Sequence, residues 1–232
     1  MVINQLMLGV CNACQIHCEH CAHSGIRQEE PRYQMPLDDL EALFHRLKVT
    51  NSQVDTLMFN GPGEPLLWEH FNQAIRLIRS RCSAKIKVTT NGLRLSSIAT
   101  DVWDALTQVC ISTYGQVINY ALTDSYANKI TYSAGEQFLA IVPGSLPVIP
   151  SYALCGCYGP LYYKRHVFPH CGPPVFGAAK QENMDAFAYA IPLHLWNPDT
   201  MNEDVPKHVL PCAWCWANGA VPKINVDNTI KK

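Results

Sequence analysis

The sequence predicts an α/β protein with a parallel β-sheet, followed by a cysteine-rich C-terminal part. Short apolar or β-branched segments alternate with amphipathic helical segments up to residue 142, a pattern typical of βα units joined by right-handed crossovers. The motifs that carry chemical groups fall where predicted strands end, and barrel-like α/β sheets place their active sites there. From residue 143 proline and glycine become dense and the helical periodicity stops. We therefore divide the chain into residues 1–142 and 143–232.

The elements of the first part follow from the spacing of its apolar residues. Strands are predicted over residues 3–10, 55–60, 85–90 and 109–113, with further extended segments at 130–132 and 137–142. Helices are predicted over residues 36–48, 67–81, 97–106 and 116–126. The first of these helices has leucines on one face and two aspartates in its first turn, where negative charge favours a helix.

Length and composition indicate an ordinary globular protein. The chain has 232 residues, 48% of them hydrophobic, and a net charge of −1, which is enough chain for a sizeable core. A near-neutral charge gives no electrostatic basis for binding nucleic acid, and the longest apolar runs are too short to span a membrane. Eleven cysteines without a secretory signal favour metal ligation over disulfides, and a cytoplasmic location.

Cys14, Cys18 and Cys21 form a C-x3-C-x2-C triplet just after the first predicted strand. Soft thiolate ligands select iron–sulfur clusters or zinc. Three ligands on a four-iron cluster leave one iron open for a substrate or cofactor, as in catalytic metal sites. Cys11 extends the pattern to C-x2-C-x3-C-x2-C, so a zinc knuckle or a closed four-cysteine cluster is an alternative.

A second motif, Gly61-Pro62-Gly63-Glu64-Pro65, directly follows the predicted strand 55–60. Glycine lets the backbone approach a ligand closely, and the prolines stiffen the loop. A carboxylate beside exposed carbonyl groups can accept hydrogen bonds from an ammonium group. A plain strand–turn–helix connection would need the glycines and prolines but not the glutamate.

The two motifs together resemble the signatures of the radical S-adenosylmethionine (radical SAM) superfamily. The resemblance implies a partial (βα) barrel, truncated here, and a [4Fe–4S] cluster on Cys14, Cys18 and Cys21 whose open iron binds SAM. The residues that it places at SAM are His20, Gly61, Pro62, Gly63, Glu64, Asn91 and Ser112. Of these, the 61–64 segment would bind the methionyl ammonium group, and the two strand-end residues would bond the ribose hydroxyls and the methionine carboxylate.

The second part of the chain holds five more cysteines, at positions 155, 157, 171, 212 and 215. A hairpin over the apolar segments 161–163 and 167–168 would present one cysteine at each end, and the distant C-x2-C would complete four thiolates. This resembles the twitch domain of radical SAM dehydrogenases of the aminoglycoside pathway. The resemblance implies an auxiliary [4Fe–4S] cluster on Cys155, Cys171, Cys212 and Cys215.

Several alternatives stay open in this second part. Cys157 can replace Cys155 as the first ligand, and Lys164-Arg165-His166 stands where the family usually has Asp-Gly. The same cysteines would also suit a structural zinc site, since closed all-thiolate sites bind zinc well. Scattered free thiols are a further alternative.

The function implied by the resemblance is that of a radical SAM oxidoreductase. An external donor such as flavodoxin or ferredoxin would supply the electron that cleaves SAM to a 5′-deoxyadenosyl radical. That radical would take a hydrogen atom from a small polar natural-product intermediate, and electron transfer to the auxiliary cluster would complete a dehydrogenation. Alternatives are a radical SAM epimerase, dehydratase or peptide-modifying enzyme, a glycyl-radical activating enzyme, and a non-enzymatic iron–sulfur or zinc protein. No residue identifies the substrate or a catalytic proton acceptor.

Overall fold

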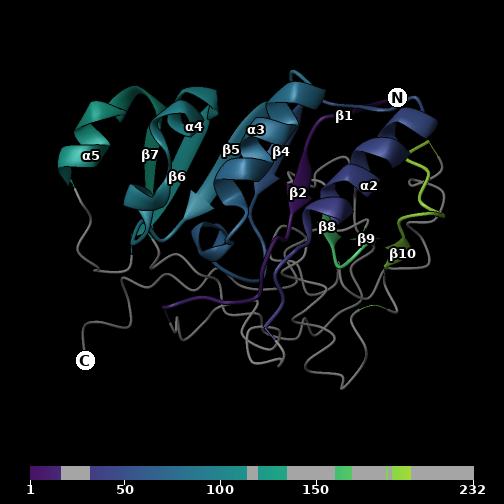
Figure 1. The fold of residues 1–232 in the computed structure, drawn as a ribbon, viewed down its shortest axis with the longest axis horizontal. Helices are drawn as coiled ribbons and strands as arrows, with labels where there is room; N and C mark the ends of the chain where they lie inside the picture. Colours follow the sequence, from purple (N-terminus) through teal and green to yellow (C-terminus); the bar gives the residue numbers. More distant parts are fainter. Residues whose placement is uncertain (17–31, 114–119, 135–159, 169–186, 188–189, 200–232) are drawn as a thin grey trace, which may run out of the picture.

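A computed structural model of the chain describes residues 1–16, 32–113, 120–134, 160–168, 187 and 190–199. Its main feature is an eight-stranded sheet (Figure 1). In spatial order the strands are β10 (Ile191–Pro192), β9 (His166–Phe168), β8 (Leu161–Tyr163), β2 (Leu6–Leu8), β4 (Thr56–Phe59), β5 (Lys85–Thr90), β6 (Gln108–Thr113) and β7 (Ile130–Ala134). The six strands from β8 to β7 are parallel, and β9 pairs antiparallel with β8 on one side and with β10 on the other. The predicted α/β class is confirmed, with a mostly parallel sheet.

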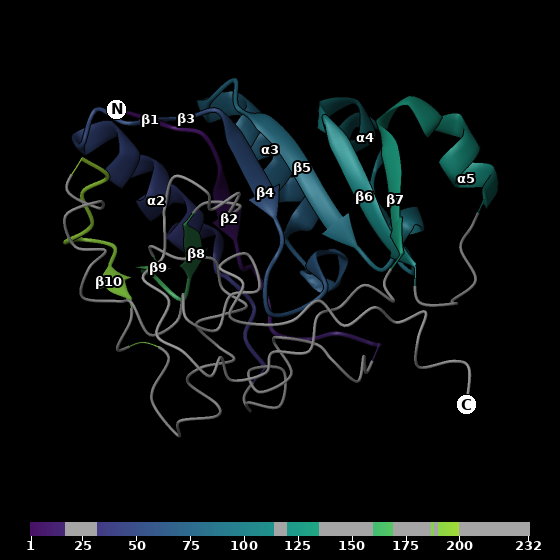
Figure 2. The same ribbon diagram turned by 180° about the vertical axis from the view of Figure 1, so that it is seen from behind.

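Helices cover one face of this sheet, as Figures 1 and 2 show from opposite sides. They are α2 (Leu37–Val49), α3 (Phe71–Arg81), α4 (Thr100–Ala105) and α5 (Tyr120–Ser125), with short 3-10 turns η1 (Pro65–Leu67), η2 (Leu95–Ser97) and η3 (Ala127–Lys129). A separate pair, β1 (Val2–Ile3) and β3 (Gln53–Val54), is also parallel. The core between helices and sheet joins strand residues such as Leu8, Phe59, Val88 and Ile111 to helix residues such as Leu43, Ile75 and Val102.

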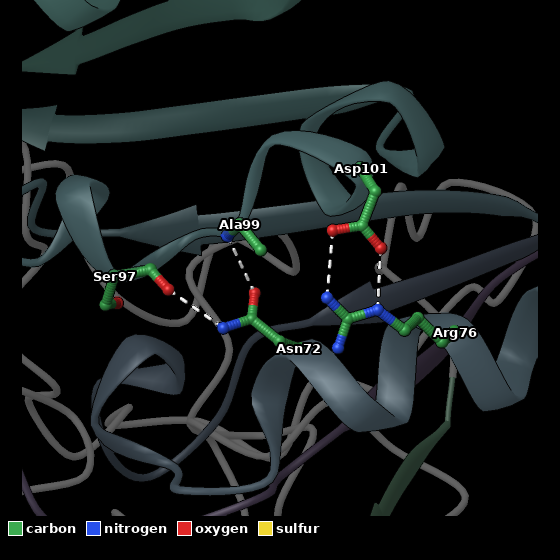
Figure 3. Close-up of polar contacts among 5 residues, drawn as sticks. All are labelled: Asn72, Arg76, Ser97, Ala99 and Asp101. Carbon is green, nitrogen blue, oxygen red and sulfur yellow. Dashed lines mark hydrogen bonds and ion pairs between the residues drawn. The ribbon is translucent and has the colours of Figure 1, made fainter.

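Polar contacts dock α4 and the turn before it onto α3 (Figure 3). The Asn72 side chain donates to the Ser97 carbonyl at 2.8 Å and accepts from the Ala99 amide at 3.0 Å. One turn along α3, Arg76 makes a bidentate pair with Asp101 at 2.6 and 2.8 Å. These contacts fix the helix that precedes β6.

The boundaries of the predicted elements are close to the observed ones, with two corrections. The strand predicted over residues 3–10 is divided into β1 and β2, and the helix predicted over 67–81 begins only at Phe71. Trp68 has extended backbone with ψ of 119°, and its buried indole donates to the Met35 carbonyl at 2.8 Å. This anchor separates η1 from α3. Residues 116–119 and 137–142 lie outside the described part.

The hairpin expected in the second part of the chain is present. β8 and β9 are joined by Lys164 and Arg165, whose φ angles of 48° and 58° are those of a type I′ turn. The Lys164 ammonium lies 5.4 Å from the ring centre of Tyr163 and 5.6 Å from that of Tyr33, within cation–π range. Because β8 pairs with β2, this hairpin belongs to the same sheet as the first part. The boundary at residues 142–143 lies outside the described residues and stays a prediction.

Among the helices in the described ranges, none is long and apolar enough to cross a lipid bilayer.

Candidate functional site

The candidate site lies at one edge of the sheet, where four adjacent parallel strands end. The segment up to Cys14 follows β2, loop 61–65 follows β4, Asn91 follows β5, and Ser112 lies in the last part of β6. The arrowheads of β4, β5 and β6 point to this common edge in Figure 2. Adjacent parallel strands bring their carboxyl ends together, so the fold places these four segments side by side.

Glu64 is the most tightly held side chain at this edge. It is 3% exposed, and its Oε1 accepts hydrogen bonds from the Thr90 hydroxyl at 2.6 Å and the Leu66 amide at 3.1 Å. Its Oε2 accepts from the Asn91 amide at 2.8 Å. Burial raises the pKa of Glu64 above its ordinary value, and the three hydrogen bonds oppose that rise. The carboxylate therefore ties loop 61–65 to the end of β5.

The main chain of the same loop is joined to the segment that leads to Cys14. The Glu64 amide donates to the Ala13 carbonyl at 2.7 Å, and the Cys11 thiol donates to the Glu64 carbonyl at 3.1 Å. A Cβ on Gly63 would lie 2.5 Å from the Ala13 oxygen and 2.7 Å from the Cys11 oxygen. Only glycine permits this contact between the two backbones.

Gly61 has a similar role one step earlier in the loop. A Cβ there would lie 2.7 Å from the Cα of Gly9, so the chains leaving β2 and β4 touch through two glycines. Gly9 in turn packs against the Tyr163 and Pro62 side chains. Hydrogen bonds among the described residues do not engage the carbonyl oxygens of Gly61, Pro62 and Gly63.

Asn91 connects the end of β5 to the predicted cluster ligand. It is 5% exposed, and its Nδ2 lies 3.9 Å from the Cys14 sulfur. Its Oδ1 accepts from the Leu93 amide at 3.0 Å, and Gly92 adopts a φ of 77° that favours glycine. The tight turn therefore fixes the amide of Asn91 beside Cys14.

The two ends of the segment that carries the cysteine triplet lie against each other. The Tyr33 amide donates to the buried Asn12 side chain at 2.7 Å, and the Met35 amide donates to the Val10 carbonyl at 2.8 Å. Cys11 and Gln34 also form a β-bridge. Residues 10–12, which precede the triplet, and residues 33–35, which follow it, thus lie together beside loop 61–65.

Ser112 is described at the same edge, one strand beyond Asn91. It is 7% exposed, and its hydroxyl oxygen lies 3.3 Å from that of Ser133 in β7. The assignment of Ser112 to SAM stays a prediction.

The remaining predicted site residues lie outside the described residues. They are Cys18, His20, Cys21, Cys155, Cys157, Cys171, Cys212 and Cys215. Cys14 is the triplet member that the structure describes, as a partly exposed free thiol. A soft sulfur donor at the entrance of this segment suits a thiolate-ligated cluster.

Two residues of the network were not singled out from the sequence. Thr90 precedes Asn91-Gly92, and its side chain shares the buried face of β5 with Ile86 and Val88. A polar residue that follows Ile86 and Val88 on the buried face, at the carboxyl end of the strand, indicates a contact within the site. The sequence pattern indicates only a possible ligand role for Cys11. Burial, with the nearby Glu64 carboxylate, raises the pKa of its thiol to about 12.

Comparison with known proteins supports the resemblance read from the motifs. The family described as the Radical SAM superfamily matches residues 8–115. Among solved structures, BtrN in complex with AdoMet and 2-DOIA has a TM-score of 0.63 at 16% identity, over 90% of this chain and 87% of BtrN. BtrN in an open conformation has a TM-score of 0.55 at 15% identity, over 90% and 86%. At these identities the similarity shows the fold alone.

A third solved structure is less similar. Streptococcus suis SuiB bound to the precursor peptide SuiA has a TM-score of 0.38 at 19% identity, over 48% of this chain and 24% of SuiB. No curated protein matches the chain.

Proposed function

We propose that this protein, whose residues 8–115 match the Radical SAM superfamily, is a radical SAM enzyme that oxidises a small polar molecule by removing two electrons and two protons. Membership of the superfamily implies an enzyme with a [4Fe–4S] cluster and SAM. When bound, these groups supply a 5′-deoxyadenosyl radical by one-electron cleavage of SAM. We assign the cluster to Cys14, Cys18 and Cys21.

The observation that carries this assignment is the network around Glu64. Its carboxylate and main chain join three segments: the approach to Cys14, loop 61–65 and the end of β5. Asn91 then places its amide 3.9 Å from the Cys14 sulfur. These residues would hold the approach to Cys14 and loop 61–65, which we call the SAM loop, at a fixed separation. Such a fixed separation is how a protein pre-organises a cofactor for reaction.

The contacts also indicate different roles for the Glu64 side chain and for the main chain of loop 61–65. The Glu64 carboxylate already accepts three hydrogen bonds from the protein, so we assign it to positioning. The carbonyl oxygens of Gly61, Pro62 and Gly63 have no described hydrogen bond, and each has two lone pairs that can accept from an ammonium group. We assign the methionyl ammonium to these main-chain oxygens. His20, Asn91 and Ser112 would contact the rest of SAM.

The oxidation follows from a second cluster, which we assign to a twitch-like domain over residues 143–232. Its ligands would be Cys155, Cys171, Cys212 and Cys215. The substrate would lose one hydrogen atom to the 5′-deoxyadenosyl radical, then a proton and one electron, and the electron would be accepted at this second cluster. The β8–β9 hairpin between Cys155 and Cys171, and the fold similarity to BtrN over 90% of the chain, support this part.

The substrate class rests on the fold similarity. BtrN was solved with 2-DOIA, and we propose a sugar or cyclitol of a natural-product pathway for this chain. Flavodoxin or ferredoxin would be the electron donor. Thiolate ligation and such a donor both suit the reducing cytoplasm that the cysteine content predicts.

The test begins with iron content after anaerobic reconstitution. The wild-type protein should hold about eight irons, and the Cys14/Cys18/Cys21 triple-alanine variant about four. Under dithionite, Cys18→Ala should lose SAM cleavage, whereas Cys212→Ala should cleave SAM without forming product. Cys82→Ala, at the end of α3, is the matched control and should behave as the wild type.

The product decides among the alternatives. With 2-DOIA, sugars and cyclitols as first candidates, loss of two mass units from the substrate supports oxidation. An unchanged mass with uptake of solvent deuterium supports an epimerase instead. Absence of SAM cleavage by the reconstituted wild type would overturn the proposed function.

A further inference from the structure

Cys11 precedes Cys14, the first cysteine of the triplet, by three residues, yet its sulfur faces loop 61–65. The side chain is 1% exposed, and Sγ lies 3.1 Å from the main-chain oxygen of Glu64. A carbonyl oxygen only accepts hydrogen bonds, so the sulfur must carry the proton in this contact. A cluster ligand is instead a thiolate. The contact and ligation therefore exclude each other.

This hydrogen bond is one of several contacts between the same two segments. The Glu64 amide donates to Ala13 in the opposite direction, at 2.7 Å. Gly63 packs directly on the backbone of Cys11 and Ala13. The Glu64 N–H is thus held by Ala13, and the Glu64 carbonyl accepts from both the Cys11 thiol at 3.1 Å and the Leu67 amide at 2.9 Å. Of these two donors, Cys11 is the one that belongs to the approach to Cys14.

We propose that Cys11 is a positioning residue for SAM, whose thiol holds the Glu64 carbonyl and so fixes loop 61–65 against the approach to Cys14. It is not a ligand of the cluster, which keeps three cysteines and an open iron. The inference rests on the proposed function, because it concerns the geometry of the SAM loop. The proposal gives a role to Cys11, which by spacing alone would be a fourth cysteine of the cluster motif.

The test compares Cys11→Ala with Cys11→Ser, and uses Cys82→Ala as the control. Serine keeps a donor for the Glu64 carbonyl, whereas alanine removes it. In Cys11→Ala we expect wild-type iron content and a dissociation constant for SAM raised about tenfold, the effect of one lost buried hydrogen bond. In Cys11→Ser the dissociation constant should return to within about threefold of the wild type.

A measurement on the metal-free protein separates this inference from the proposed function. Hydrogen exchange of the Glu64 amide should be faster in Cys11→Ala than in Cys11→Ser and the wild type, because the loop loses one of its hydrogen bonds to the approach to Cys14. If the wild type bound no SAM but this exchange pattern held, the proposed function would fail and the contact would stand.

Two results would overturn the role of Cys11. Loss of about four irons in both Cys11 variants would make it a cluster ligand. Equal SAM affinity and equal Glu64 exchange in Cys11→Ala and Cys11→Ser would make it a packing residue only.

Discussion

The hydroxyl of Thr90 lies 2.6 Å from Oε1 of Glu64 and joins the end of β5 to the loop that follows β4. The same hydroxyl oxygen accepts from the Gly92 amide at 3.0 Å. Its proton is therefore directed to the carboxylate, and Glu64 receives donors at both of its oxygens. This arrangement makes the carboxylate a structural part of the candidate site.

Glu64→Gln should destabilise the protein and weaken SAM binding together. An amide places an NH2 group at one of the two oxygen positions, where it would face the Asn91 N–H on one side or the Leu66 N–H and the Thr90 hydroxyl on the other. At least one buried donor then loses its acceptor, at a cost of about 1–3 kcal/mol. Urea unfolding of the metal-free protein and equilibrium dialysis with SAM measure the two effects.

Glu41→Gln is the matched control for this change. Glu41 makes a surface ion pair with Arg81 at 2.8 Å, and such pairs contribute about 0–1 kcal/mol. SAM affinity should not change in this control. Weaker SAM binding by Glu64→Gln without any loss of stability would favour direct contact between the Glu64 side chain and SAM.

Thr90→Val should be more harmful than Thr90→Ser. Valine has nearly the same shape but leaves Gly92 without its acceptor and Glu64 without one donor, at a cost of about 1–3 kcal/mol. Serine keeps both hydrogen bonds and loses one methyl group. Thermal unfolding of the metal-free variants measures the difference, and equal melting temperatures would show that the hydroxyl has no structural role.

The sequence predicted the parts of this site that depend on local patterns. The strand 85–90 agrees with β5 because alternating burial of Ile86, Val88 and Thr90 is visible as period-two spacing. Loop 61–65 was identified because glycine, proline and glutamate stand together after a buried strand. Its position at the carboxyl end of a parallel strand then followed from the fold class.

Contacts between segments distant in sequence were not predictable. The hydrogen bond from Cys11 to Glu64 joins residues 53 positions apart, and spacing alone suggested ligation for Cys11. The turn at Lys164 and Arg165 lacks the Asp-Gly that signals a hairpin. It forms nonetheless because β8 pairs with β2 and because Lys164 packs on Tyr33 and Tyr163. Tertiary contacts there override local preference.

Gly63→Ala should disrupt the site far more than Gly9→Ala. The new Cβ at position 63 would meet three backbone atoms of Cys11 and Ala13 at 2.5–2.9 Å, and backbone cannot move aside without opening the loop. At position 9 the nearest atoms belong to the Tyr163 and Pro62 side chains, at 3.0 and 3.1 Å. We expect Gly63→Ala to cost about 1–3 kcal/mol and to abolish SAM binding in dialysis. Similar SAM affinity in both variants would contradict the close contact at Gly63.

Arg165→Gly should be more stable than Arg165→Ala. Both variants lose the guanidinium, whose Nε lies 3.6 Å from the Asp39 carboxylate. The difference between their free energies of unfolding therefore reports the backbone conformation at position 165. A left-handed φ of 58° strains alanine but not glycine, and we expect about 1 kcal/mol in favour of glycine. Urea unfolding measures it. Greater stability of the alanine variant would mean that the turn is not left-handed.

The two polar contacts of Figure 3 should differ in their response to mutation and to pH. Asn72→Ala removes a donor to Ser97 and an acceptor from Ala99 and should cost about 1–2 kcal/mol. Arg76 and Asp101 are more than half exposed, so Asp101→Asn should have a smaller effect that salt reduces further. Both effects are measured as shifts in melting temperature.

The hydrogen bonds from Arg76 hold the pKa of Asp101 below its ordinary value of 3.8. A lowered pKa means that the unfolded chain takes up the proton first as the pH falls. The contribution of Asp101 is therefore present above pH 3.8 and is lost as the pH falls through the folded pKa. The difference in melting temperature between the wild type and Asp101→Asn should shrink over that range, while the deficit of Asn72→Ala persists. A pH-independent Asp101→Asn difference would show that the ion pair does not form in solution.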